Sequence, residues 1–195
     1  MLSLRSTLLL ALLPRAFGLG ILFPLYFCGG EGGNCNTTTC PNYSSLLSGI
    51  QAHPSVTLHM IVNPFNGPLS TAVINANYTN YPACLPHLKT ATPASALLGY
   101  VSTNHSHRHC ENITADIRTY ASWPSSYRPT GIFFDEAPSN AGNVSLYKYY
   151  AGFARGMGFS FIVFNPGTKA DSGFYDPTAA DMVVTYEGPL FPRRT

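Results

Sequence analysis

The sequence has few charged residues. Only 10% of its 195 residues carry a charge, with 11 Lys and Arg against 9 Asp and Glu. Arg5 and Arg15 lie in a leading segment that we expect to be removed, which leaves nine bases against nine acids. Proteins that bind nucleic acid or anionic lipid through net charge need a cationic surface, so the sequence predicts neither partner.

Motifs for nucleotides and metals are also missing. No GxGxxG or phosphate-binding loop follows an apolar run, which argues against a nucleotide cofactor. Neither CxxC nor HExxH occurs. His105, His107 and His109 stand in a polar stretch without a matching set of carboxylates. We therefore expect no metal and no cofactor.

Residues 1–20 have the pattern of a signal peptide. Arg5 precedes the apolar run Leu8–Leu13, and small residues follow. The run ends at Pro14, well short of the roughly 20 apolar residues that a membrane span needs, and no later segment is long enough either. We therefore predict a secreted protein, extracellular or in the cell wall, with residues 21–195 as one domain.

Sequons for N-linked glycosylation are more frequent than chance. Random placement of Asn, Ser and Thr would give roughly two. The sequons present are at Asn36, Asn42, Asn77, Asn104, Asn112 and Asn143. This excess predicts a glycoprotein, whose sugars would supply the solubility that the few charges do not.

The five cysteines are consistent with secretion, because the secretory pathway is oxidising. Cys35 and Cys40 could close a small loop, and Cys84 and Cys110 a longer one, which would leave Cys28 unpaired. The connectivity stays open at this point, because spacing alone does not fix it.

Short apolar runs rich in β-branched and aromatic residues predict strands, and helix-length segments separate several of them. The runs are 21–27, 56–63, 95–102, 130–136, 159–165 and 181–187, and the crossover segments are 43–52, 82–90 (interrupted by Pro86), 110–122 and 144–157. Near-continuous apolar strands joined by crossovers are typical of parallel sheets covered on both faces. The sequence therefore predicts an α/β fold.

Polar residues follow most of the predicted strands. They are Asn63, Thr103, Asp135, Glu136, Asn165 and Glu187. A TIM-type (β/α) barrel carries its functional groups at the carboxyl ends of its strands, so this pattern favours a barrel. The chain ends eight residues after Glu187, whereas a complete barrel needs about 250 residues. We expect an incomplete barrel with about six of eight strands, truncated at its C-terminus, whose open edge favours self-association.

Three acids, Asp135, Glu136 and Glu187, directly follow apolar runs. A carboxylate at the end of a buried strand costs desolvation energy unless it is paired or used. A structural ion pair with Arg108 or Arg128 could account for one carboxylate at such a position, but it accounts less easily for all three. Cleavage of a glycosidic bond needs two carboxyl groups, one to protonate the leaving oxygen and one to attack the sugar or activate water.

A set of motifs, in order and with compatible spacing, resembles the spherulin-4-like family, which is related to glycoside hydrolase family 135. The motifs are FPLYF (23–27), MIVNPFNGP (60–68), LGYVSTNHSHR (98–108), GIFFDE (131–136), FNPGT (164–168) and ADMVVTYE (180–187). The resemblance implies a (β/α) barrel and endo-acting hydrolysis of α-1,4-linked galactosamine and N-acetylgalactosamine, as in galactosaminogalactan. It also implies that Asp135, Glu136 and Glu187 are the catalytic acids.

We assign Asp135 as the nucleophile, Glu187 as the acid/base and Glu136 as a supporting charge, because neighbouring residues leave a strand in opposite directions. The expected substrate-binding residues are Tyr26, Asn63, Tyr100, Thr103, Arg108 and Asn165. Two other interpretations stay open. One is a non-catalytic polysaccharide-binding glycoprotein of a cell wall or spore coat, and the other is a structural surface protein without a sugar site.

Overall fold

The structure is a computed structural model that describes residues 20–188. The remaining residues, 1–19 with nearly all of the predicted signal peptide and 189–195, lie outside the described range. One parallel sheet contains the strands side by side in chain order. The strands are β1 (Gly20–Leu25), β2 (Thr57–Val62), β3 (Ser95–Ser102), β4 (Gly131–Asp135), β5 (Phe161–Phe164) and β6 (Met182–Val183).

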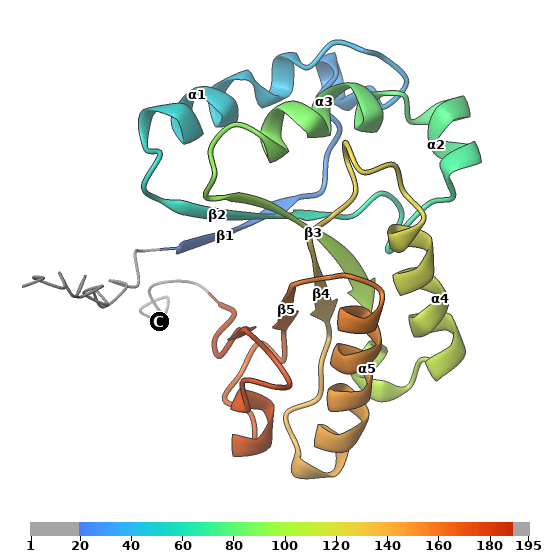
Figure 1. Ribbon diagram of the computed structural model, residues 1–195, viewed down its shortest axis with the longest axis vertical. Coiled ribbons are helices and arrows are strands. Elements are labelled where there is room, and N and C mark those ends of the chain that lie inside the picture. The colour runs from blue at the N-terminus through green and yellow to red at the C-terminus, as the bar shows by residue number, and fades with distance from the viewer. Residues whose placement is uncertain (1–19, 189–195) are drawn as a thin grey trace, which may run out of the picture.

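Helices connect the strands and lie on the convex side of the curled sheet (Figure 1). They are α1 (Ser44–Ala52), α2 (Thr71–Asn77), α3 (Asn80–Lys89), α4 (Cys110–Ala121) and α5 (Val144–Gly156). Short 3-10 turns at 31–33, 41–43, 104–106, 141–143 and 172–175 shape the loops. The fold is therefore a partial TIM-type barrel, which confirms the predicted fold class.

Both faces of the central strands β2 to β5 are buried. One face packs against the helices, with Met60, Val62, Val101, Phe134 and Phe164 in the larger core. The concave face has its own cluster of Ile61, Leu98, Tyr100, Phe133 and Val163. Successive side chains of a strand point to opposite faces, so burial on both sides explains why the strands are nearly continuous apolar runs.

Helix α3 continues through Pro86, contrary to the expected interruption. A proline inside a helix removes one backbone hydrogen bond. Its neighbours Leu85 and Leu88 are fully or almost fully buried against the sheet, and this packing holds the helix across the proline. Helix α2 was not predicted. It is short, and Ser70 caps it by accepting a hydrogen bond from Val73 N at 3.4 Å.

The last predicted strand, 181–187, shortens to the two residues of β6. Beyond it the chain still follows β5 and the loop after β5. Val184 N donates to Phe164 O at 2.9 Å, and Glu187 N donates to Gly167 O at 3.0 Å. These bonds bring Glu187 to the same end of the sheet as the carboxyl ends of β4 and β5.

The disulfides differ from the pairs considered from the sequence. Cys28 bonds to Cys35 and Cys40 to Cys84, while Cys110 is free. The loop after β1 turns back on itself and then crosses α3, which places Cys40 next to Cys84 rather than next to Cys35. Cys110 begins α4 and faces Tyr150 of α5 instead.

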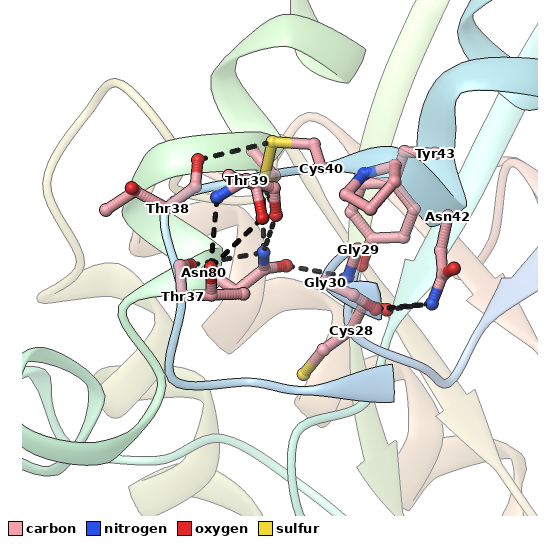
Figure 2. Close-up of a disulfide and its surroundings, with 12 residues drawn as sticks. Cys28, Gly29, Gly30, Thr37, Thr38, Thr39, Cys40, Asn42, Tyr43 and Asn80 are labelled. Carbon is pink, nitrogen blue, oxygen red and sulfur yellow. Dashed lines mark hydrogen bonds between the residues drawn. A yellow bond between two sulfur atoms is a disulfide. The ribbon is translucent and has the colours of Figure 1, made fainter. Parts of the chain in front are cut away.

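Asn80 joins the loop after β1 to α3 (Figure 2). Its side chain is fully buried. The Oδ1 atom accepts from Gly29 N at 2.7 Å, and Nδ2 donates to the carbonyls of Thr37 at 3.3 Å and Thr39 at 2.9 Å. A Cβ on Gly29 would lie 2.7 Å from the Tyr43 ring, so only glycine fits there. The loop is thus fixed by an amide as well as by two disulfides.

Strands β1 and β6 are the outermost strands of the described sheet. Self-association through an open edge stays a prediction. None of the helices between residues 20 and 188 combines the length and hydropathy needed to cross a bilayer.

Candidate active site

Asp135, Asn165 and Glu187 meet at the carboxyl ends of β4 to β6. Asn165 Nδ2 donates to Asp135 Oδ1 at 2.7 Å and to Glu187 Oε1 at 3.2 Å. One amide group therefore holds both acids, and their two oxygens lie no more than about 6 Å apart. The two acids therefore lie close together at the strand ends, as expected for neighbouring parallel strands.

The Asn165 side chain is itself rigidly placed. It is almost fully buried, and its Oδ1 accepts from Gly167 N at 3.0 Å. Its backbone is fixed on both sides, because Asn165 N donates to Phe134 O and Ala137 N donates to Asn165 O, each at 2.9 Å. Gly167 has a φ of +62°, and a Cβ there would lie 3.2 Å from Glu187 Oε2. Glycine at this turn therefore leaves room for the Glu187 carboxylate.

Two tyrosines border the Asp135 carboxylate. Tyr26 packs edge-on against Tyr100, with ring centroids 5.8 Å apart. Burial raises the pKa of the Tyr100 hydroxyl, and its hydrogen bond to Asp135 raises the pKa further. Burial also raises the pKa of Tyr26, with the charges of Asp135 and Glu187 adding to the effect. Both hydroxyls stay protonated at neutral pH, so Tyr100 acts as a donor to Asp135.

Glu136 lies beside the pair in a neighbouring polar pocket. Its φ of +54° is in the left-handed region, which non-glycine residues rarely adopt outside functional or strained sites. Ser102 Oγ donates to Glu136 Oε2 at 2.7 Å. The pocket has a volume of about 510 Å³ and is lined by Phe65, Asn66, Ser102, Asn104, Arg108 and Glu136. The Glu136 carboxylate thus belongs to this polar pocket, next in the chain to the Asp135 of the neighbouring pair.

Thr103 supports the site from below. It is fully buried, and its Oγ1 lies within hydrogen-bond distance of the carbonyls of Asp135, at 2.8 Å, and Glu136, at 2.9 Å. The Tyr147 hydroxyl donates to the same Oγ1. A fully buried side chain cannot reach a ligand, so Thr103 positions the ends of β3 and β4 rather than binding substrate.

Arg108 is fixed by Asp116, which the sequence analysis did not select. Arg108 Nη1 donates to Ser102 O at 2.9 Å and to Asp116 Oδ2 at 2.6 Å. Burial raises the pKa of Asp116, and the ion pair with Arg108 opposes this shift. Because α4 carries Asp116 back toward the loop, the pairing depends on the helix direction and is not visible as a motif.

The last of the selected residues, Asn63, has a local role in the described structure. Its Oδ1 accepts from Gly67 N at 2.9 Å and shapes the loop that presents Phe65 and Asn66 to the pocket. Within residues 20–188, no group of three His, Cys, Asp or Glu side chains could hold a metal ion.

A half-barrel with paired carboxylates, an amide and tyrosines at the carboxyl ends of its strands belongs to the class of TIM-barrel proteins that carry their site on this face. Residues 20–191 match the model of spherulation-specific family 4. The chain therefore belongs to this spherulin-4 family.

Two individual proteins are similar to this chain. Spherulin-4 of Physarum polycephalum is 34% identical over 125 residues, which are 63% of this chain and 35% of that protein. The crystal structure of Sph3 from Aspergillus clavatus, in complex with GalNAc, has a TM-score of 0.73 and 29% sequence identity. The match covers 87% of this chain and 66% of the Sph3 chain, so this chain spans only part of each relative.

Proposed function

We propose that the protein is a secreted glycoside hydrolase acting on a polysaccharide that contains α-1,4-linked galactosamine and N-acetylgalactosamine. The main observation in support is that the Asn165 side-chain amide donates hydrogen bonds to both Asp135 and Glu187 at the carboxyl ends of the strands. The similarity to Sph3, crystallised with GalNAc, supports an amino sugar as the ligand.

The environments of the two acids support different roles. Asp135 accepts hydrogen bonds from Asn165 and Tyr100, which hold its carboxylate in place for attack on a sugar. Glu187 is exposed and has one longer bond to Asn165, so it can carry a proton to a leaving group. Asp135 Oδ1 and Glu187 Oε1 lie within about 6 Å of each other, close enough for both carboxyl groups to act on one glycosidic bond, and we propose that the mechanism is the retaining one.

In the first step, the Asp135 carboxylate attacks the anomeric carbon while the bond to the leaving oxygen breaks. Glu187 gives its proton to that oxygen, and a glycosyl ester forms on Asp135. In the second step, Glu187 takes a proton from water as the water attacks the same carbon, which releases the sugar and restores both acids. Tyr26, near Asp135, and Phe65, which lines the polar pocket, have exposed aromatic rings that are suited to stacking on sugar rings.

The test compares polysaccharide cleavage by the parent chain with Asp135→Asn and Glu187→Gln, measured as new reducing ends. We expect losses of at least about a thousandfold for Asp135→Asn and about a hundredfold for Glu187→Gln, without a lower melting temperature. Glu111→Gln is the matched control, because Glu111 is exposed in the first turn of α4.

Binding without cleavage is the second candidate function. The similarity to Sph3 motivates it, because that structure was solved in complex with GalNAc and so supports sugar binding more directly than cleavage. If the parent chain binds the polysaccharide but releases no reducing ends, the non-catalytic glycoprotein of a cell wall or spore coat replaces the hydrolase. Secretion is proposed on the leading sequence pattern and on the two disulfides, which form in oxidising compartments.

A further inference from the structure

Asn104 stands at the edge of the polar pocket and begins the sequon Asn104-His105-Ser106. It is exposed. Within the described part of the chain, its side-chain amide makes no hydrogen bond, so a sugar could replace one of its hydrogens without breaking a contact. The pocket behind it also contains Glu136 and Arg108.

Two other sequons differ in this respect. Asn42 Nδ2 donates to Gly30 O at 2.5 Å, and Asn143 Nδ2 donates to Asn140 Oδ1 at 2.9 Å. A sugar linked to either nitrogen would have to be accommodated beside the hydrogen bond that this nitrogen already donates. Asn104 is thus a less obstructed acceptor than Asn42 or Asn143.

The backbone holds Asn104 in place over the cleft. Asn104, His105 and Ser106 all have positive φ, at +45°, +50° and +71°. His105 N donates to Glu136 O at 2.8 Å, and Ser106 N donates to Thr103 O at 3.0 Å. Such a left-handed run persists only where its surroundings fix it, and here the loop is tied to the end of β4. A glycan on Asn104 would therefore have its first sugar anchored beside the pocket.

We propose that Asn104 carries an N-linked glycan that overlies the polar pocket and limits how a long polysaccharide enters this part of the cleft. The inference rests on the proposed function, since it concerns access to the same site. Phe65 and Asn104 line the same polar pocket, so a polymer that occupies this pocket must pass a glycan on Asn104, whereas a single sugar at the Asp135 and Glu187 pair need not enter the pocket. Removing the glycan should strengthen binding of the polymer selectively.

The experiment uses the full chain secreted from a eukaryotic host. Glycopeptide mass analysis reads occupancy at each sequon. Binding is measured for an α-1,4-linked N-acetylgalactosamine oligomer and for free N-acetylgalactosamine. The variants are Asn104→Gln and Ser106→Ala, and the second removes the sequon while keeping Asn104. Asn112→Gln is the matched control, because Asn112 is an exposed sequon on α4 that does not line the pocket.

We expect a glycan on Asn104 and, in both variants, about fivefold tighter binding of the oligomer, the gain from roughly one additional hydrogen bond. Binding of the single sugar and the Asn112→Gln control should not change. Trimming of the parent chain with an endoglycosidase should reproduce the gain without any substitution.

An unmodified Asn104 overturns the proposal, as does an occupied Asn104 whose removal leaves oligomer binding unchanged. If neither the parent chain nor any variant binds either sugar, the proposed function fails, and so does the proposal that the Asn104 glycan limits entry of the polymer. Occupancy at Asn104 is read separately by mass, so this result differs from failure of the glycan assignment alone.

Discussion

The loop after β1 and the loop after β3 differ in how they are fixed. The first, residues 26–43, is held by disulfides Cys28–Cys35 and Cys40–Cys84 and by the buried Asn80. The second, residues 103–109, has no covalent bond to the rest of the fold and depends on the Thr103 hydroxyl and on backbone bonds to Glu136. Of these two loops, only the second lines the polar pocket. The disulfides therefore lie away from the pocket, whereas hydrogen bonds fix the pocket loop. In this loop the backbone has positive φ angles, a strained conformation for residues other than glycine.

The largest expected effect is loss of the Cys40–Cys84 disulfide. Its partners are 44 residues apart, and in the chain-entropy account Cys40→Ala with Cys84→Ala should lower the free energy of unfolding by about 4 kcal/mol. Cys28→Ala with Cys35→Ala is the matched control, because a separation of 7 residues predicts a smaller loss of about 2.5 kcal/mol. Denaturant titration measures both. Equal losses of unfolding free energy in the two double variants would contradict the loop-entropy account.

Asn80→Ala should rank next, at about 3 kcal/mol of unfolding free energy. The substitution leaves Gly29 N and the carbonyls of Thr37 and Thr39 without this partner in a buried place. Asn80→Asp separates the two halves of the amide, because it keeps the acceptor for Gly29 N and loses the donor. If the alanine variant unfolds at the parent's denaturant midpoint, the disulfides alone fix this loop.

From the sequence it was easier to predict which polar side chains meet at the strand ends than which residues support them. Asp135, Asn165 and Glu187 could be selected because a polar residue after an apolar run is a local signal, and parallel strands bring such residues to one edge. The half-barrel was predictable for the same reason. Asp116 could not be selected, because its partner Arg108 is reached only when α4 has its observed direction.

The disulfide pairs and the conformation of Glu136 were also beyond the sequence. Cys40 pairs with a cysteine 44 residues away because the loop after β1 crosses α3. The spacing of cysteines in the sequence does not reveal this crossing. The positive φ of Glu136 turns its side chain toward Ser102 while Asp135 contacts Asn165. Alternation along a strand predicted that the two acids diverge, but not where each would go.

Thr103→Val tests the loop after β3, with an expected loss of about 2 kcal/mol of unfolding free energy. The valine keeps the volume but removes the hydroxyl, whose one hydrogen is shared between the carbonyls of Asp135 and Glu136 and whose oxygen accepts from the Tyr147 hydroxyl. Thr103→Ser should restore most of the loss because it keeps the hydroxyl. We also expect weaker binding of the oligomer in the valine variant, because Glu136 and the loop lose their common support. A destabilised variant with unchanged binding would mean that the pocket does not depend on Thr103.

The smallest expected effect is that of Asp116→Asn, which asks whether the ion pair helps to hold the loop after β3. The pKa of Asp116 is raised by burial despite the opposing effect of Arg108. A carboxyl group whose pKa is higher in the folded state stabilises the fold when protonated, and this stabilisation is lost as the pH rises through the folded-state pKa. The melting temperature of the parent minus that of the variant should therefore become more positive as the pH is lowered from about 7 to about 3. A difference that instead grew toward neutral pH would mean that the ion pair outweighs burial, and the loop would then be held by charge as well as by the Thr103 hydroxyl.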